Sequence, residues 1–388
     1  MNDAEEPEPR NRADPGRVAP GGVGRGYGGA VTDDSREGRG SAAFAGLTAR
    51  NAVECVDLAE HPAALDAGGP WFVVVPFEGG GRAWRFRETG TRRTPDDGAP
   101  AWVGPAPDAW RTSLDGAAYR DAVRAVRAEI RAGEVYQVNV CRVLEAPLAA
   151  GAGGEPDARA LAGVLGSGNP APYGGYVHVP ASAGVDPVWV VSASPELFLS
   201  LRDGVLTSGP IKGTAARAGG LTDKDRAENV MITDLVRNDL QRVCVPGSVE
   251  VVDLLAEEEH PGLVHLVSRV AGRLRPGLGW AEVLAATFPP ASVSGAPKSS
   301  ALRTIRRLEP VPRGPYCGAV GWVDPARGRA ELAVGIRTFW WSDGALRFGT
   351  GAGITWGSDP DHEWAETELK ARRLVALASS GRTDEEDG

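Results

Sequence analysis

Two segments of the sequence carry acidic residues at a spacing that puts them on one face of a helix. Asp225 and Glu228 stand three residues apart, and so do Glu363 and Glu366. Residues three apart on a helix are neighbours, so two such faces meeting could hold a hard divalent cation. Mg²⁺ suits such a site, since it binds a few carboxylates together with water and an anionic substrate. Two solvated helix faces would show the same spacing.

One lysine lies in a segment whose backbone is constrained. Lys212 stands in "SGPIKGTAAR", residues 208 to 217, between Pro210 and Gly213, with Thr214 following. Proline fixes its own φ, and glycine adopts conformations that other residues avoid. Lysine usually occupies a solvated face, so this setting raises the question of what Lys212 does there.

Three other segments could carry chemistry. Glu196 follows a proline in "SASPELFLS". If it is buried, its pKa would be raised and it would suit general-acid catalysis; the alternative is a solvated glutamate at the end of a strand. Arg337 is a cation in the apolar segment "VGIRTF". It is either a functional residue or a residue whose side chain faces solvent by the alternation of the strand. The Gly-rich "GTGAGIT", residues 349 to 355, could cradle an anion or form a tight strand turn, and it lacks the ending of a P-loop.

The composition limits the classes of partner. A net charge of −9 argues against nucleic acid or an anionic membrane surface as the main partner. Four scattered cysteines have neither metal-ligand spacing nor the density of a disulfide scaffold. The acidic start does not resemble a signal peptide, and no apolar run is long enough to span a bilayer. We therefore expect a soluble, cytoplasmic protein.

The expected elements place these residues in one large folded region. Residues 1–45 are predicted to be a disordered tail, 46–110 a short N-terminal region and 111–380 the catalytic domain. Helices are predicted over 114–132, 222–242, 297–308 and 362–378, from apolar periodicity and stop signals. Strands are predicted mostly in adjacent pairs, as in 71–78 with 82–88 and in 187–206 with a turn at Asp203-Gly204. This order favours an α+β fold with antiparallel sheets and outer helices over a doubly wound fold.

The ordered set of motifs resembles the chorismate-utilising enzymes. The matching segments run, in order, "YQVNVCRVL", "SASPELFLS", "SGPIKGTAAR", "AENVMITDLVRNDLQRVCVPGSVEV", "LVHLVSRVAGRL", "FPPASVSGAPKSSALRTIRRLEP", "PYCGAVGW", "AVGIRT" and "GAGI…EWAETELKA". They cover about residues 115 to 378. The resemblance implies the anthranilate synthase component I-like fold, in which antiparallel sheets pack as a sandwich with helices outside. It also implies that Mg²⁺ is the cofactor.

The resemblance implies roles for matched residues. Glu228 and Glu366 would be the principal Mg²⁺ ligands, with Asp225 and Glu363 more distant or bound through water. Glu196 would protonate the departing C4 hydroxyl of chorismate. Further contacts to the substrate would come from Gly213, Thr214, His265, Tyr316, Arg337, Gly351, Gly353 and Lys370.

Two matched positions separate the subfamilies. Isochorismate and salicylate synthases have a water-activating lysine where this chain has Gln137, so the resemblance favours ammonia over water as nucleophile. Anthranilate synthases usually have alanine in "PIAGT", whereas aminodeoxychorismate synthases typically have "PIKGT", as here with Lys212. In that subfamily the lysine is thought to attack C2 of the ring, after which ammonia adds at C4. A purely electrostatic Lys212 is the alternative.

The expected activity is therefore that of aminodeoxychorismate synthase component I, on the route to p-aminobenzoate and folate. The chain shows no glutaminase residues of its own, so ammonia would come from a separate glutamine amidotransferase subunit or from solution. Two alternatives stay open. The first is amination at C2, by anthranilate synthase component I or 2-amino-2-deoxyisochorismate synthase; the second is a non-catalytic homologue that binds chorismate.

Overall fold

A computed structural model describes residues 39–91, 101–149, 154–215, 217, 219–260 and 263–381. Most of the predicted disordered tail, 1–38, lies outside the described residues. Ordered structure nevertheless begins before residue 46, since β1 (Ser41–Phe44) pairs with β2 (Leu47–Asp57) and with β7 (Tyr173–Val179). Its short sequence, "SAAF", has a single large apolar residue, which is why composition does not reveal it. Partners on both sides supply its hydrogen bonds.

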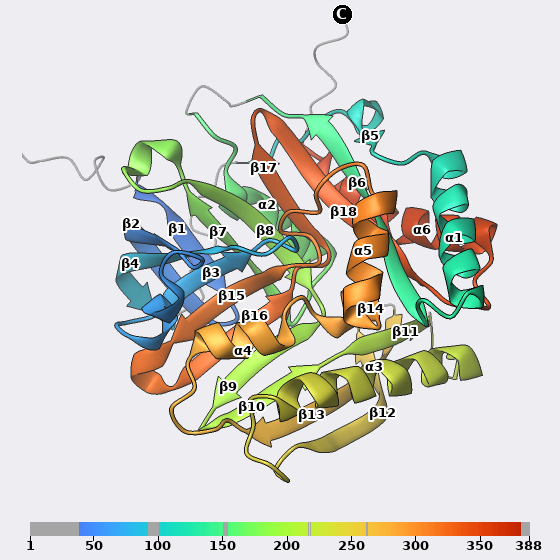
Figure 1. The fold of residues 1–388 in the computed structure, drawn as a ribbon. Coiled ribbons are helices and arrows are strands. Elements are labelled where there is room, and N and C mark those ends of the chain that lie inside the picture. Colours follow the sequence, from blue (N-terminus) through green and yellow to red (C-terminus); the bar gives the residue numbers. More distant parts are fainter. Residues whose placement is uncertain are drawn as a thin grey trace, which may run out of the picture. The chain divides into compact units, whose positions relative to one another are not determined.

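Every strand pairing among the described residues is antiparallel, which confirms the predicted fold class (Figure 1). One continuous path of neighbours runs through β6 (Gln137–Pro147), β18 (Ala345–Ile354), β17 (Thr338–Ser342), β8 (Val188–Ser194), β7, β1, β2, β4 (Arg82–Gly90), β3 (Trp71–Val75), β15 (Ala319–Asp324), β16 (Arg329–Val334), β9 (Leu197–Arg202), β10 (Val205–Gly209), β13 (Leu263–Arg273) and β12 (Glu250–His260). Three shorter strands join its ends: β5 (Arg111–Thr112) and β14 (Gly295–Ala296) pair with β6, and β11 (Ile211–Ala215) pairs with β13.

Six α-helices lie in the described part of the chain. They are α1 (Gly116–Arg131), α2 (Ala158–Gly168), α3 (Asp223–Gln241), α4 (Trp280–Thr287), α5 (Lys298–Leu308) and α6 (Pro360–Ala378). The four predicted helices are confirmed as α1, α3, α5 and α6. The prediction missed α2 and α4, because both are short and carry apolar or small residues on most of their surface. None of the described helices is long and apolar enough to cross a membrane.

The helices lie on the outside of the sheet (Figure 1). Two of them, α3 and α6, carry the predicted acidic residues. Helix α3 packs along β13 and β11, whereas α6 packs on β18 and also contacts α1. Helix α3 begins with a capping box, in which the Thr222 hydroxyl accepts from the Asp225 N–H and the Asp225 carboxylate accepts from the Thr222 N–H. Helix α6 begins with Asp359 as its N-cap and a proline in its first turn.

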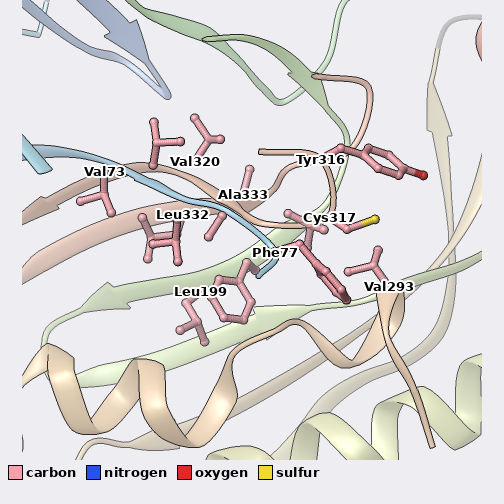
Figure 2. Close-up of a cluster of buried hydrophobic side chains, with 14 of the residues drawn as sticks. Val73, Phe77, Leu199, Val293, Tyr316, Cys317, Val320, Leu332 and Ala333 are labelled. Atoms are coloured by element: carbon pink, nitrogen blue, oxygen red, sulfur yellow. The ribbon is translucent and has the colours of Figure 1, made fainter. Parts of the chain in front are cut away.

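The main core joins residues from both ends of the strand path. Figure 2 shows part of it, with Val73 from β3, Leu199 from β9, and Val320 and Leu332 from β15 and β16. The aromatic ring of Tyr316 lies in the same cluster, beside Cys317. Every residue of β3 and most residues of β15 are buried, so a change in register would misplace apolar side chains on both faces of these strands.

Two local predictions need correction. The apolar alternation of residues 329–341 predicts one continuous strand, but the segment is divided between β16 and β17, and Arg337 lies between them with φ of 52°. The Gly-rich segment 349–355 was expected to be an anion cradle or a tight turn. Residues 349–354 instead belong to β18, which pairs with β6 along its whole length. Small residues are required there because neighbouring side chains lie against the strand. The predicted turn at Asp203-Gly204 is confirmed, with φ of 53° and 75°.

Candidate functional site

The constrained segment around Lys212 is a β-bulge. Ile211 pairs with Val267 and Thr214 with His265, so β11 has one residue more than β13 between these two pairs. Gly213 adopts φ of 89°, and a Cβ added there would lie 2.8 Å from Cβ of Asp225. A bulge re-aims a side chain that a regular strand would place on the other face. The glycine therefore sets where Lys212 points and lets α3 approach closely.

The Lys212 amine lies over a glycine of β18, close to Gln137 of β6. A Cβ added to Gly353 would lie 3.2 Å from Nζ of Lys212 and 2.5 Å from Nε2 of Gln137. Gln137 is buried, and its Oε1 has no hydrogen-bond partner in the described part of the chain. The structure thus brings Lys212, Gln137 and Gly353 together, as the sequence motifs predicted for one site. A buried amide oxygen without a partner is a candidate acceptor for a ligand.

Burial determines the direction in which the pKa of Lys212 shifts. Desolvation lowers the pKa of this amine, while the carboxylates of Glu228, Glu196 and Glu366 oppose the shift. Lys370 acts in the same direction as burial, since it is a like charge. The net direction is downward. The sequence could not tell which influence prevails, and the structure favours an amine that loses its proton more readily than a solvated lysine.

Glu196 lies at the junction of β8 and β9, and its side chain is only 3% exposed. Burial raises the pKa of Glu196 to about 7, even though a hydrogen bond from Ser292, the charge of Lys212 and the Ile211 N–H all lower it. The carboxyl is therefore substantially protonated near neutral pH, which a general acid requires. The hydrogen bond from Ile211 also ties Glu196 to the bulge that carries Lys212.

The four predicted metal-ligand residues lie on α3 and α6. Desolvation raises the pKa of Glu228, with Glu363 and Asp225 adding to the shift, so these three carboxylates lie near one another. The side chains of Glu228 and Glu363 are 16% and 5% exposed. Asp225 differs from them, because one of its oxygens accepts two hydrogen bonds from Thr222 in the helix cap. Its carboxylate is thereby held at the start of α3.

Glu366 is partnered by a lysine one turn along the same helix. The Lys370 ammonium lies 2.6 Å from the Glu366 carboxylate and donates to the Gly351 carbonyl at 3.0 Å. Desolvation works against the charged form of Glu366, although 47% of its side chain is exposed, and Lys370, Lys212 and Lys224 outweigh it and lower the pKa. Helix α6 is therefore linked to β18 at the strand that also carries Gly353.

Arg337 has the properties of an anion-binding residue. Its positive φ turns it out of the strand direction, and burial lowers the pKa of its guanidinium. Within the described residues, no carboxylate or hydrogen-bond partner of the Arg337 side chain is seen. A partly buried arginine without an acidic partner is suited to a carboxylate supplied by a ligand. Its position on the backbone is fixed, since its carbonyl accepts from the Ala193 N–H at 3.0 Å.

The remaining predicted contacts fall in two places. His265 is 2% exposed and pairs with Thr214 across the bulge, so the backbone brings both next to Lys212. Tyr316 instead lies in the core, where its ring covers Gly349 and its hydroxyl lies 3.9 Å from Sγ of Cys141. This position gives no support to a substrate contact by Tyr316. Gly351 is needed for packing, since a Cβ there would lie 2.6 Å from Sγ of Cys141.

Three residues near the site were not predicted from the sequence. Ser292 hydrogen bonds to Glu196, and Asn229 donates to the Lys212 carbonyl at 3.4 Å and to the Leu266 carbonyl at 2.8 Å. Lys224 lies 3.7 Å from Glu228 and 3.5 Å from Glu363. All three stand within or beside the matched motifs, but their types alone suggest only helix capping or solvated surface.

A buried arginine supports the segment that carries Ser292. Arg313 is 1% exposed and donates to the carbonyls of Val293 and Asn139 at 2.9 and 2.7 Å. It is also paired with Glu309, whose carboxylate accepts from the Cys141 N–H. The Arg313–Glu309 pair therefore joins β6, which carries Gln137, to the loop that carries Ser292.

The carboxylates of α3 and α6 include a candidate ligand for Mg²⁺, but they do not form a complete metal site by themselves. Oε1 of Glu228 is buried without a hydrogen-bond partner among the described residues, and carboxylate oxygens are the ligands that Mg²⁺ prefers. The described residues contain no cluster of three or more metal-ligating side chains close enough to enclose an ion. A magnesium site here would thus use one or two carboxylates, with a substrate and water completing the coordination.

The fold is shared with solved structures of an anthranilate synthase component I and an isochorismate synthase. Anthranilate synthase component I from Streptococcus pneumoniae TIGR4 superposes with a TM-score of 0.65 at 23% identity, covering 88% of this chain and 81% of that one. MenF, the menaquinone-specific isochorismate synthase from Escherichia coli, superposes with a TM-score of 0.69 at 19% identity, covering 88% of each chain. At such identities the likeness shows the fold alone.

The family model described as chorismate binding enzyme matches residues 85–376, and the chain belongs to this family. Anthranilate synthase component 1 from Saccharolobus solfataricus is 40% identical over 218 residues, which are 53% of this chain and 50% of that protein. Aminodeoxychorismate synthase component 1 from Salmonella typhimurium is 35% identical over 279 residues, which are 69% of this chain and 59% of that protein. The chain thus spans about half the length of these curated relatives, which carry two different activities.

Gly353 offers a test of the site geometry. We expect Gly353→Ala to lower kcat/KM for chorismate consumption by about 10- to 100-fold, because the new methyl group would displace the ends of the Gln137 and Lys212 side chains. Gly357→Ala is the matched control, since a Cβ there meets nothing within 4 Å. Circular dichroism and thermal unfolding would show that both variants are folded. Unchanged kinetics in Gly353→Ala would place the reacting groups elsewhere.

Proposed function

We propose that this protein is an aminodeoxychorismate synthase of the component I type, which converts chorismate and ammonia to 4-amino-4-deoxychorismate. The observation that carries the proposal is Lys212, held by a β-bulge with its amine beside Gln137 and with its pKa lowered by burial. An amine nucleophile must be neutral, aligned and close to its target. The bulge fixes the position of the amine and burial favours its neutral form, and both support the proposal.

In the proposed first step, the neutral Lys212 amine bonds to C2 of the chorismate ring. The ring electron pairs shift, the C4–O bond breaks, and Glu196 gives its proton to the departing oxygen, which leaves as water. Hydroxide is a poor leaving group, and a carboxyl with a pKa of about 7 can supply this proton near neutral pH. The step leaves a secondary ammonium at C2 and a Glu196 carboxylate.

In the proposed second step, ammonia bonds to C4 and the electron pairs shift back. The C2–N bond breaks and Lys212 leaves as the neutral amine, while the nitrogen on C4 carries one proton in excess. That proton returns to the Glu196 carboxylate, so both residues recover their starting forms. Over the two steps, chorismate and ammonia give 4-amino-4-deoxychorismate and water.

Gln137 accounts for the choice of ammonia over water in this proposal. An amide cannot remove a proton from water, whereas ammonia is nucleophilic without activation. The Gln137 side chain is buried beside the Lys212 amine, and its unpartnered oxygen can accept a hydrogen bond from an ammonia or substrate hydroxyl group. The glutaminase that would release ammonia is proposed to be a separate subunit.

Substrate carboxylates and a metal ion complete the proposed site. Arg337 lacks an acidic partner among the described residues and is suited to one carboxylate of chorismate. Lys370, which donates to the Gly351 carbonyl, and the backbone at Gly351 and Gly353 are proposed as further contacts to the substrate. Glu228 and Glu363 or Glu366 would hold Mg²⁺. When bound, Mg²⁺ would neutralise a substrate carboxylate and reduce the pull of Glu228 on the Lys212 proton.

Amination at C2 is the second candidate, and one comparison favours it. The relative with 40% identity is an anthranilate synthase component 1, although the match covers half of each chain. The Lys212 side chain weighs against this candidate, because an amine beside the ring would occupy the C2 side of the site. The two activities give different products and are separated by a single assay.

The product assay tests the proposal with two lysine variants. We expect the wild type, incubated with chorismate, Mg²⁺ and ammonium at mildly alkaline pH, to form 4-amino-4-deoxychorismate. Lys212→Ala is expected to lose at least about 100-fold in kcat, because the nucleophile is absent. Lys212→Arg is expected to be equally impaired, since it keeps the charge but its guanidinium does not deprotonate. Products are identified by chromatography and mass.

Lys212→Arg distinguishes the two roles of the lysine. Substantial activity in this variant would mean that the positive charge suffices and that no covalent step takes place on Lys212. Anthranilate or 2-amino-2-deoxyisochorismate from the wild type would overturn the proposed activity and support amination at C2.

The pH dependence tests Glu196 as the acid. We expect kcat/KM for chorismate, measured at a fixed concentration of free ammonia, to fall as pH rises above about 7, because the carboxyl then loses the proton that it must donate. Glu196→Gln should be about 100- to 10,000-fold slower and should lack this decline. A decline of the same shape in Glu196→Gln would assign it to another group.

A further inference from the structure

Lys224 lies between the acidic residues of two helices. It is the second residue of α3, and its ammonium is 3.7 Å from Oε1 of Glu228, one turn along the same helix. The same ammonium is 3.5 Å from Oε1 of Glu363 on α6. One cation therefore contacts carboxylates from both helices, at the place where the carboxylates could share a metal ion.

The negative charges of Glu228 and Glu363 require neutralisation by a cation more than those of a solvated pair would. Their side chains are 16% and 5% exposed, so water compensates their charges poorly. Oε1 of Glu228 has no hydrogen-bond partner within the described residues, although Lys224 lies at ion-pair distance from it. A contact of 3.7 Å neutralises charge without a close hydrogen bond. Such a contact can be exchanged for a stronger one.

The Lys224 ammonium can move into solvent when it leaves the two carboxylates. Its side chain is 52% exposed, in contrast to the two carboxylates. A lysine can keep its methylenes on the protein and turn its ammonium into water. The carboxylates are fixed on their helices and remain behind.

We propose that Lys224 is an internal counter-ion, which occupies the divalent-cation position between α3 and α6 in the metal-free protein and is displaced when the metal binds. This inference rests on the metal site of the proposed function. An ammonium and a divalent cation repel each other strongly at a few ångströms, so the two cannot share the carboxylates. Lys224 thus lowers the affinity for the metal and stabilises the metal-free arrangement of the two helices.

The test is a metal titration without chorismate or ammonia. Mn²⁺ serves as the probe, with free Mn²⁺ followed by its electron paramagnetic resonance signal and Mg²⁺ added as competitor. Removing the charge with Lys224→Met should tighten Mn²⁺ binding by about tenfold, and Lys224→Gln should do the same. Lys224→Arg keeps the charge and should not tighten it.

Arg237→Met is the matched control for net charge. Arg237 lies on the same helix and pairs with Asp234, away from Glu228 and Glu363, so its removal should leave Mn²⁺ affinity within about threefold of the wild type. A second readout is thermal unfolding. Metal-free Lys224→Met should melt at a lower temperature than the wild type, and saturating Mn²⁺ should raise its melting temperature by more.

Unchanged or weaker Mn²⁺ binding in both neutral variants would overturn the proposal, and so would a lack of Mn²⁺ binding in every variant. The titration involves no turnover, so its result is separate from the proposed activity. A wild type that forms the C2-aminated product while Lys224→Met binds Mn²⁺ more tightly would sink the proposed activity and leave the counter-ion role standing.

Discussion

The site depends on the burial of one amine among carboxylates. Desolvation favours the neutral form of Lys212, and the nearby carboxylates favour the charged form, so their balance sets the chemistry available to it. The backbone bulge at Gly213 decides that the amine faces Gln137 and Gly353 instead of the opposite face of β11. Asn229, which donates to the Lys212 carbonyl and to β13, connects this bulge to α3. A change in the bulge would therefore alter position and protonation together.

Three acidic residues on α3 and α6 have a lysine at ion-pair distance. Lys224 lies near Glu228 and Glu363, and Lys370 lies near Glu366. Arg337 differs, because its side chain has no acidic partner within the described residues. Among the described residues, Arg337 thus offers a guanidinium without an acidic partner to an anion, and α3 and α6 offer carboxylates to a cation. This combination suits a substrate with carboxylates that binds together with a divalent metal.

The sequence predicted the fold class, which the structure confirms, and a set of site residues whose roles stay predictions. Spacing placed Glu228 and Glu366 on helix faces, and the motif order placed Lys212, Gln137 and Glu196 in one site. Periodicity could not reveal the bulge, since it depends on the register between β11 and β13, which are about fifty residues apart. Nor could it decide between a strand and a turn at 349–354, because Gly-rich segments are typical of turns when the side chains that cover them are unknown. The substrate contact of Tyr316 stays a prediction, and the Tyr316 hydroxyl lies 3.9 Å from Sγ of Cys141. Lys224 was missed because a lysine near a helix start is typical of solvated surface.

The covalent role of Lys212 is the central claim, and it is tested most directly by trapping the intermediate. The wild-type protein would be mixed with chorismate and Mg²⁺ without ammonia, quenched with acid, digested and examined by mass spectrometry. The account predicts that the peptide carrying Lys212 gains the mass of chorismate less one water, and that Gly353→Ala forms less of this adduct. An unmodified Lys212 peptide under conditions in which added ammonia gives product would contradict the account and leave Lys212 an electrostatic role.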